Sequence, residues 1–323
     1  MNWRALLPTL VGPVVLMSML AIAEVRYPGF DTAGVISGLW SSRAPLILVS
    51  IGMTWVVIAG GIDLAVGAVA TLSAFVTVSA AQAGVPPVLA VVCGPLVGLV
   101  AGATQGLAVH RLGLPAFIVT LAGMFLARGA ALMLSPEPLS LQRGYFGELP
   151  GWTWSLGGTE STVTSLCVLV VAGCAVVWDF RGVGGRWVRA LGDNPAACSG
   201  RVPVARVRIA TYVLSGALAG VAGIAALLYV PTASHDQSQG MELDAIASVV
   251  IGGTLITGGR GSVLGTLAGV HVVGLALILP AYEPGLSPGA VRMLVAAVLL
   301  AFVVAQTVLR RLAGSTRRDV LPA

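Results

Sequence analysis

The stretch GGIDLAVGA, residues 60–68, lies between two apolar runs in a chain whose apolar runs follow one another almost without interruption. It places two glycines and one acid, Asp63, where a membrane helix must break or turn. A carboxylate surrounded by hydrocarbon is costly and marks a functional site by default, and irregular backbone at membrane depth persists only where protein or a wet cavity covers it. The stretch therefore indicates a path across a membrane rather than a catalytic cleft.

The composition excludes a soluble globule. Of the 323 residues, 57% are hydrophobic and only 10% are charged, and uncharged stretches of about 20 residues are typical of membrane spans. We predict an all-α, polytopic membrane protein with a single transmembrane domain over residues 1–323. About ten transmembrane helices are expected, at 6–23, 44–59, 64–84, 87–109, 115–134, 162–178, 209–230, 243–256, 262–280 and 289–309. The start of the chain also resembles a signal peptide, but its apolar run is long and favours a retained helix.

The arginines predict the orientation. With the N-terminus inside, 13 of the 18 basic residues fall on the inner side, including a group within 181–208 and a tail at 310–318. This bias follows the positive-inside rule and places both termini in the cytoplasm. The short span 243–256 keeps this distribution only if it crosses the membrane, so we predict a crossing there. The rule does not distinguish two full spans from a buried hairpin at 44–84, because both leave the orientation unchanged.

Several functions are excluded by what the sequence lacks. All 18 basic residues are arginine, so the lysine of a nucleotide-binding P-loop is absent, and any ATP that drives transport is hydrolysed by another polypeptide. Four cysteines without C-x-x-C spacing and three scattered histidines indicate neither a disulfide framework nor a metal site. With no paired carboxylate in a span, we expect no catalytic residues and no cofactor. The net charge of +5 is too small to indicate a nucleic-acid partner.

Glycines recur on single faces of the predicted spans. They stand at every fourth residue in three of them: Gly94, Gly98, Gly102 and Gly106; Gly216 and Gly220; Gly261, Gly265 and Gly269. Small residues allow helices to approach closely in a membrane, so these stripes indicate tight contact within one subunit or, alternatively, a seam between subunits. The segments GGIDLAVG (60–67) and GGRGSVLG (258–265) also share their glycine spacing. Repeated halves are common in transporters, although one eight-residue pattern does not establish a repeat.

Few polar residues are available to a translocation pathway. The candidates for the pathway or its gate are Gly60, Gly61, Asp63, Glu242 and Asp244. Asp63 has two interpretations that can coexist. It is either a polar element of the pathway or the N-cap of the following helix, where a carboxylate accepts hydrogen bonds from free backbone N–H groups.

Two connecting loops carry the remaining signals. The inner segment 179–208 contains an apolar and basic stretch, a break at Gly192-Asp193-Asn194-Pro195 and then a short candidate helix. It is either an ordinary positive loop or a docking helix for a cytoplasmic partner, and its length and pattern favour docking. The outer, periplasmic loop 135–161 holds two tryptophans, which either anchor at the membrane interface or meet an external partner.

At these motifs the chain resembles a known family. GGIDLAVGA, LPAFIVTLAGMFLARG (114–129), ALGDNPAACSG (190–200) and MELDAIASVVIGGTLITGGRGSVLGTLAG (241–269) are similar in order and spacing to the permease subunits of ribose-type bacterial ABC importers for monosaccharides. The resemblance covers nearly the whole chain, and its last motif is the most specific. The wording of the second and fourth motifs is most similar to the galactofuranose importer branch.

The resemblance implies a ten-helix, multi-pass permease of the bacterial inner membrane. Its implied partners are two cytoplasmic ATPase subunits, a periplasmic sugar-binding protein and a second permease subunit, identical or a sister. The family's ATPase coupling loop maps here onto Arg189, Gly192, Asp193, Asn194, Ala197 and Gly200. The sequence departs from the family where A-R-L-S-G-I is usual and this chain has Ala197-Cys198-Ser199-Gly200-Arg201, and where the serine after GGIDL is Ala65.

Two other functions compete with a sugar permease. An ion-coupled secondary carrier or channel needs polar coupling residues within its spans, and only Asp63 is available. An ABC permease of the same fold for amino acids or nucleosides is the second alternative. Sensitivity of uptake to vanadate or to an uncoupler distinguishes the first alternative, and binding by the cognate external protein distinguishes the second.

Overall fold

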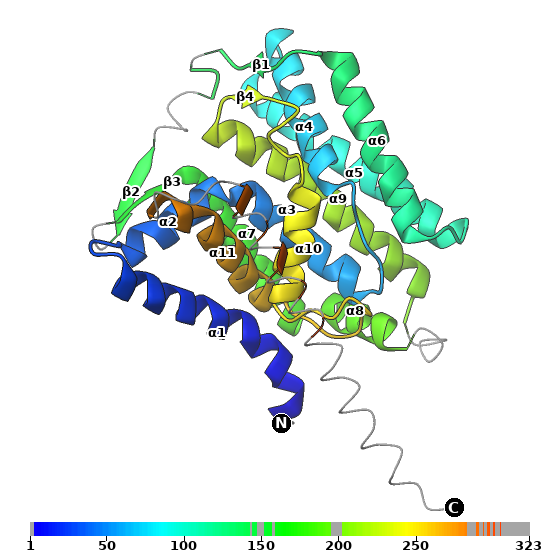
Figure 1. Ribbon diagram of the computed structural model, residues 1–323. Helices are drawn as coiled ribbons and strands as arrows, with labels where there is room; N and C mark the ends of the chain where they lie inside the picture. The colour runs from blue at the N-terminus through cyan, green and yellow to red at the C-terminus, as the bar shows by residue number, and fades with distance from the viewer. Residues whose placement is uncertain are drawn as a thin grey trace, which may run out of the picture.

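The computed structural model describes residues 3–142, 144–146, 152–156, 159–194 and 202–282, with seven further positions between 289 and 304. The described residues are mostly helical (Figure 1). Their α-helices are α1 (Trp3–Arg26), α2 (Thr32–Ser42), α3 (Ala44–Ile58), α4 (Val66–Gln82), α5 (Pro87–Arg111), α6 (Ala116–Leu134), α7 (Val163–Arg181), α8 (Val183–Asp193), α9 (Val204–Tyr229), α10 (Met241–Ile251) and α11 (Val263–Ile278). Two antiparallel pairs of short strands accompany them: β1 (Leu139–Ser140) with β4 (Thr232–Ala233), and β2 (Thr153–Leu156) with β3 (Thr159–Thr162).

The predicted helical class is confirmed. Nine of the ten predicted spans each coincide with one helix, and the tenth, 289–309, has only seven of its 21 positions among the described residues. The two strand pairs and helix α2 were not predicted. Helix α2 begins where Asp31 accepts a hydrogen bond from the Gly34 N–H at 3.0 Å, which satisfies one of the free donors of its first turn.

Only some of these helices are long enough to cross a bilayer alone. In the part of the chain that the structure describes, α5, α6, α7 and α9 have the length and hydropathy of a span, and α2 with α3 forms a pair bent by 71° that qualifies together. Leu96, Phe125 and Val170 are exposed on the outer faces of α5, α6 and α7, as side chains that face lipid are. Helices α4 and α11 are apolar but shorter, so the number of crossings stays a prediction.

Helix α10 is shorter than the span predicted at 243–256. Its 11 residues extend about 16 Å at 1.5 Å per residue, roughly half of a hydrocarbon core of about 30 Å. The helix ends at Ile251 because Gly252 and Gly253 turn the chain, the latter with a positive φ of 86°. The predicted end at residue 256 is therefore wrong, and residues 252–262 form a loop that leads to α11.

Non-helical backbone leads into α10. Strand β4 pairs with β1, whose Ser140 carbonyl accepts a hydrogen bond from the last residue of α4, Gln82, at 3.4 Å. Met241, nine residues after the start of β4 at Thr232, lies beside Gly67 in the first turn of α4. Residues 232–241 therefore run along the whole of α4, and together with α10 they form one broken element.

The glycine stripes lie in helix contacts within this one chain. Helices α5 and α9 make the most extensive contact of the fold. A Cβ built on Gly98 would overlap the backbone of Gly216, and one built on Gly102 would overlap that of Tyr212. In the same way, a Cβ on Gly269 would overlap the Ser248 carbonyl of α10. The first interpretation of the stripes, close packing inside one subunit, is confirmed for these positions.

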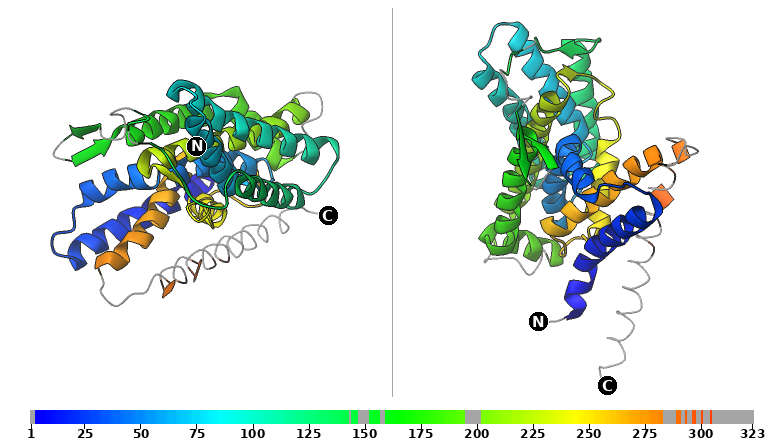
Figure 2. Two further views of the ribbon diagram at one scale, coloured as in Figure 1. Left: turned by 90° about the horizontal axis from the view of Figure 1, so that it is seen from above. Right: turned by 90° about the vertical axis from the view of Figure 1, so that its left-hand side faces the viewer.

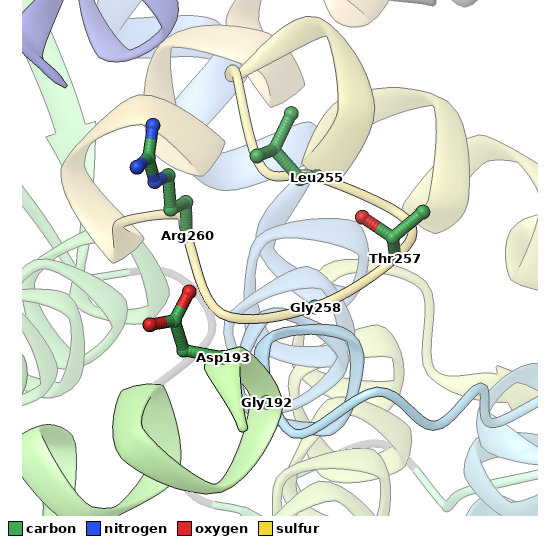
Figure 3. Close-up of a pocket in the computed structure, with 6 residues that line it drawn as sticks. All are labelled: Gly192, Asp193, Leu255, Thr257, Gly258 and Arg260. Carbon is green, nitrogen blue, oxygen red and sulfur yellow. The ribbon is translucent and has the colours of Figure 1, made fainter. Parts of the chain in front are cut away.

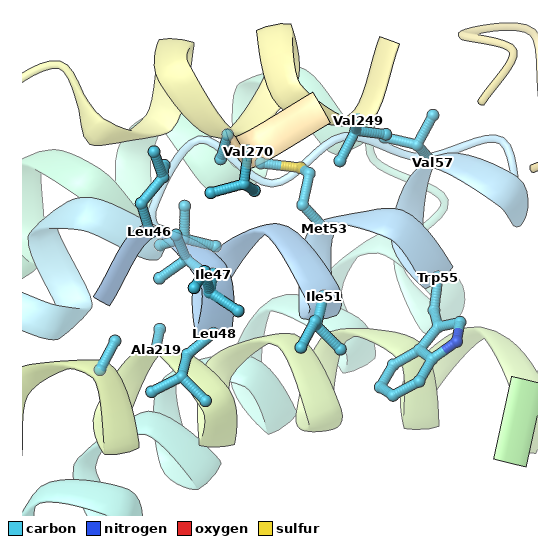
Figure 4. Close-up of a cluster of buried hydrophobic side chains, with 14 of the residues drawn as sticks. Leu46, Ile47, Leu48, Ile51, Met53, Trp55, Val57, Ala219, Val249 and Val270 are labelled. Carbon is cyan, nitrogen blue, oxygen red and sulfur yellow. The ribbon is translucent and has the colours of Figure 1, made fainter. Parts of the chain in front are cut away.

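Helix α3 is the centre of the hydrophobic core. Every residue from Ala44 to Ile58 is buried, and Figure 4 shows its side chains between α9 on one side and α10 and α11 on the other. Ile47, Ile51 and Met53 are fully enclosed. A helix that is apolar on all faces is stable only when other helices surround it, so α3 determines where its C-terminal neighbour, the GGIDL segment, can lie.

The two ends of the bundle differ. The β1–β4 pair lies at the top of Figure 1, whereas α8 and the loop between α10 and α11 lie at the bottom, which we call the α8 end. Helix α1 packs along α11 at the outside of the bundle (Figure 2). Segments far apart in sequence thus meet at two places, around the start of α4 and at the α8 end.

Candidate functional site

Asp63 belongs to the turn between α3 and α4. Its side chain is 1% exposed. Its Oδ1 accepts a hydrogen bond from the Ala65 N–H at 3.0 Å, and its Oδ2 accepts one from the Ser215 hydroxyl of α9 at 2.8 Å. The helix N-cap is Ala65, so the prediction that Asp63 caps α4 is corrected to an Asx turn two residues earlier, because Asp63 bonds its own backbone two residues on. Asp63 thus fixes this turn to α9.

The two glycines before Asp63 let the chain reverse. Gly60 has a positive φ of 81°, a conformation that favours glycine. Gly61 lies against the Tyr212 ring and hydroxyl, where a Cβ would overlap the side chain. The positive φ explains Gly60, which is exposed, and the contact with Tyr212 explains Gly61. Their role in a pathway stays a prediction.

Glu242 in the first turn of α10 forms an ion pair with Arg128 of α6, with 2.9 Å between Oε1 and Nη2. The side chain of Glu242 is 10% exposed and that of Arg128 is 35% exposed. Both residues stand in apolar segments, where charges are rare and commonly functional. Glu242 was predicted from the sequence, but its partner Arg128 was not. The sequence signal for Arg128 was the position of an arginine within the predicted span 115–134.

Gly67 brings the start of α4 to this ion pair. A Cβ built on Gly67 would stand 2.7 Å from Glu242 Oε2 and 2.8 Å from the Ser238 carbonyl oxygen. The first turns of α4 and α10 therefore meet, with Arg128 of α6 at the same place. Helices that begin inside a bundle, with irregular backbone beside them, are typical of transporter binding sites. Asp244 is half-buried in the same first turn of α10, so the structure brings both acids of that turn to this region.

Helix α8 at the other end is amphipathic. Gly185, Val188 and Leu191 are buried, whereas Arg186 and Trp187 are exposed. This helix was not predicted, although apolar residues recur at helical spacing from 185 to 191. It includes Gly192 and Asp193, which were predicted to begin the break. The short helix predicted after the break falls in the next segment of the chain. Residues 195–201, which include the predicted Ala197 and Gly200, lie outside the described residues.

The end of α8 packs on both glycine turns. A Cβ built on Gly192 would overlap the Ile58 carbonyl oxygen and would stand 2.5 Å from the Gly259 nitrogen. The Gly259 N–H also donates to the Ile58 carbonyl oxygen at 2.8 Å, and Gly258 lies 3.1 Å from Gly60 by the same measure. The segments that share a glycine spacing, 60–67 and 258–265, are therefore neighbours that meet beneath α8.

A pocket of about 330 Å³ opens beside this contact. It is lined by Gly192, Asp193, Leu255, Thr257, Gly258 and Arg260, and Figure 3 shows the end of α8 facing the loop that precedes α11. Asp193 and Asn194 are exposed here. Of the predicted coupling residues, these two are accessible at the α8 end, whereas Arg189 turns inward to Asp179 of α7 at 2.7 Å.

The described residues contain no group of three or more His, Cys, Asp or Glu that could hold a metal ion. His235 stacks on Phe75 with 4.4 Å between ring centroids, and His271 bonds the Leu267 carbonyl oxygen in its own helix. Both histidines thus have structural contacts.

The fold and these sites define a class: a multi-helix membrane protein with a broken helix and a partly buried ion pair inside the bundle, features typical of transporters. Residues 35–304 match the family described as branched-chain amino acid transport system / permease component, and the chain belongs to that family. The predicted membership of a permease family is therefore confirmed.

Its relatives are named as permeases. The chain is 34% identical over 299 residues to the inner membrane ABC transporter permease protein YjfF of Escherichia coli K12, covering 92% of this chain and 90% of the relative. It is 34% identical to the fructose import permease protein FruG of Bifidobacterium longum, covering 82% and 81%, and 32% identical to the ribose import permease protein RbsC of E. coli K12, covering 81% and 82%. No solved structure matches the chain significantly.

Proposed function

We propose that this chain is the membrane-spanning permease subunit of an ABC importer for a monosaccharide. Its membership of the permease family and its likeness to permeases named for fructose and ribose support this function. The structural observation that carries it is the seating of the amphipathic helix α8 on both glycine turns. A partner that moves α8 would therefore move the end of α3 and the loop 252–262 directly.

The proposal assigns about ten crossings, with both termini and α8 in the cytoplasm. Residues 232–241 and α10 together make one broken crossing, and 289–309 makes the last. This assignment places α8 and Arg260 on one side and the two strand pairs on the other, in agreement with the distribution of arginines.

The sugar would cross where α4, α6 and α10 meet. The Arg128–Glu242 pair and the buried turn around Asp63 supply the polar groups of this region. A permease of this kind needs only weak sugar binding, because a periplasmic binding protein captures the substrate. The pair would then act as a gate that opens when α6 and α10 separate, with Asp244 in the same turn of α10 as Glu242. Gly60 and Gly61 would contribute through the turn that leads into α4.

The partners in this proposal are two cytoplasmic ATPase subunits, a periplasmic sugar-binding protein and a second permease, either identical or a sister chain. The ATPase would dock on α8 and on the segment that follows it. Galactofuranose is the first sugar to test, because PAFIVTLAGMF (115–125) and ELDAIASVVIGGTL (242–255) resemble that importer branch.

The test is uptake by the complete complex in proteoliposomes. The permease, the ATPase and the binding protein encoded beside it are reconstituted, and uptake of labelled sugars is measured with ATP inside the vesicles. We expect uptake that stops with vanadate and continues with a protonophore. Uptake that survives vanadate and collapses with the protonophore would instead support an ion-coupled carrier and refute the proposal.

A second substrate class has one specific observation in its favour. The matching family is described by branched-chain amino acid transport, so an amino acid is the alternative cargo. Calorimetric titration of the purified binding protein with galactofuranose, ribose, fructose and leucine separates the two. Binding of leucine without binding of any sugar would transfer the proposal to that class.

A further inference from the structure

One buried carboxylate joins three elements at the α8 end. Asp179, in the last turns of α7, is fully buried. Its Oδ2 pairs with Arg189 Nη2 of α8 at 2.7 Å and also accepts a hydrogen bond from the Val263 N–H at 3.2 Å. Val263 is the first residue of α11, where a negative charge is favourable because of the free N–H groups and the helix dipole. Asp179 therefore connects α7, α8 and α11.

Arg189 completes the connection from α8. Its Nη1 donates to the Asp179 carbonyl oxygen at 2.8 Å and to the Gly185 carbonyl oxygen at 3.3 Å. Its Nη2 also donates to the Gly261 carbonyl oxygen at 3.4 Å, in the loop before α11. The positively charged Arg189 side chain thus holds three backbone carbonyls and one carboxylate, which come from α7, α8 and the loop before α11.

A second contact anchors the same C-terminal half of α8. Gly192 packs on Ile58 and Gly259 without room for a side chain, while Arg189 is fixed one turn earlier. Helix α8 is thereby attached to α3 at its last turn and to α7 and α11 through the ion pair. A buried ion pair is weak evidence for stability, because desolvation offsets much of the attraction. We attribute the presence of the pair instead to the fixed geometry that it maintains between α7, α8 and α11.

We propose that the Asp179–Arg189 pair is the tether by which α11 and the loop 252–262 follow α8 when the ATPase moves. This inference rests on the proposed function and refines it. Arg189 acts as a positioning residue inside the permease, and the ATPase docks on other parts of the segment. Without the tether, α8 moves with the ATPase while α11 stays behind.

The test measures the ratio of sugar transported to ATP hydrolysed by the complete reconstituted complex. The variants are Asp179→Asn, which removes the charge at nearly constant shape, and Arg189→Gln. We expect intact assembly by size exclusion, retained hydrolysis and a ratio that falls about tenfold, because each variant removes one partner of a buried pair. Arg181→Gln is the matched control, since it removes an exposed charge from the same turns of α7.

Arg189→Lys keeps the charge and separates coupling from folding. We expect it to assemble and to recover most of the ratio that Arg189→Gln loses. A wild-type ratio in both Asp179→Asn and Arg189→Gln overturns the tether, and so does a lysine variant that assembles with a ratio as low as the glutamine variant. If the wild-type complex shows no vanadate-sensitive uptake, the proposed function fails, whereas a coupled wild type with indifferent variants refutes the tether alone.

Discussion

Replacing Gly192 by alanine tests the contact between α8 and the two glycine turns. The added methyl group would overlap the Ile58 carbonyl oxygen and would stand 2.5 Å from the Gly259 nitrogen and 3.0 Å from the Ile58 carbonyl carbon. These are backbone atoms, which cannot rotate away as a side-chain tip can. The end of α8 must therefore lift from the loop, or the loop must move.

Two opposing effects determine the free-energy change that Gly192→Ala causes in the seated position of α8. In a helix without close neighbours, alanine is about 0.5–1 kcal/mol more favourable than glycine. Insertion of a methyl group into a closely packed contact costs about 1–3 kcal/mol. The second effect is larger, so we expect the seated position of α8 to lose about 1–2 kcal/mol, and about 1.4 kcal/mol lowers an equilibrium constant tenfold.

The assay is the ratio of sugar uptake to ATP hydrolysis in proteoliposomes, with Gly173→Ala as control. Gly173 lies within α7, and a Cβ there would meet nothing within 4 Å. We expect the ratio to fall several-fold in Gly192→Ala and to stay at the wild-type value in Gly173→Ala. Equal ratios in the two variants, with the complex assembled, would refute the argument that α8 works through this contact.

Three further predictions concern packing, capping and the gate. Gly98→Ala should destabilise the α5–α9 contact by about 1–3 kcal/mol, seen as a lower thermal midpoint in detergent, whereas Gly129→Ala in open space on α6 should not. Ser262 accepts the Gly265 N–H at 3.0 Å as the N-cap of α11, so Ser262→Ala should cost about 1 kcal/mol in the same assay. Glu242→Gln breaks the ion pair with Arg128, and we expect ATP hydrolysis without sugar to rise while uptake falls.

Each of these has a clear contrary result. A thermal midpoint for Gly98→Ala equal to that of Gly129→Ala would mean that α5 and α9 separate easily. An unchanged midpoint for Ser262→Ala would show that Asp179 alone caps α11. Wild-type uptake and basal hydrolysis in Glu242→Gln would exclude the ion pair as a gate.

The sequence predicted the long helices because their apolar runs exceed what a soluble fold requires. It did not predict where α10 ends, because Gly252 and Gly253 were counted inside an apolar run although they turn the chain. It also began the break at Gly192, whereas α8 continues to Asp193. Glycine was thus counted as helical at Gly252 and as a breaker at Gly192, because hydropathy and residue type alone do not report the local backbone conformation.

The polar contacts were harder to predict. Arg128 and Glu242 are 114 residues apart, and a single sequence contains no information that pairs them. Arg189 was predicted as part of the ATPase coupling loop, and its pairing with Asp179, only ten residues away, was not predicted. By contrast, the shared spacing of the two glycine segments was visible in the sequence, and in the structure the segments meet each other at Gly60 and Gly258, beside the end of α8.

In the proposed function, a separate ATPase subunit binds the α8 end of this chain. Trp187 is an exposed residue of α8, and Trp152 is an exposed residue beside β2 in the predicted periplasmic loop. A photo-crosslinking amino acid at each position, activated in cells that express the complete transporter, reports the neighbour of each end. We expect position 187 to crosslink to the ATPase subunit and position 152 not to do so. Crosslinking of position 152 to the ATPase, with none from position 187, would contradict the account.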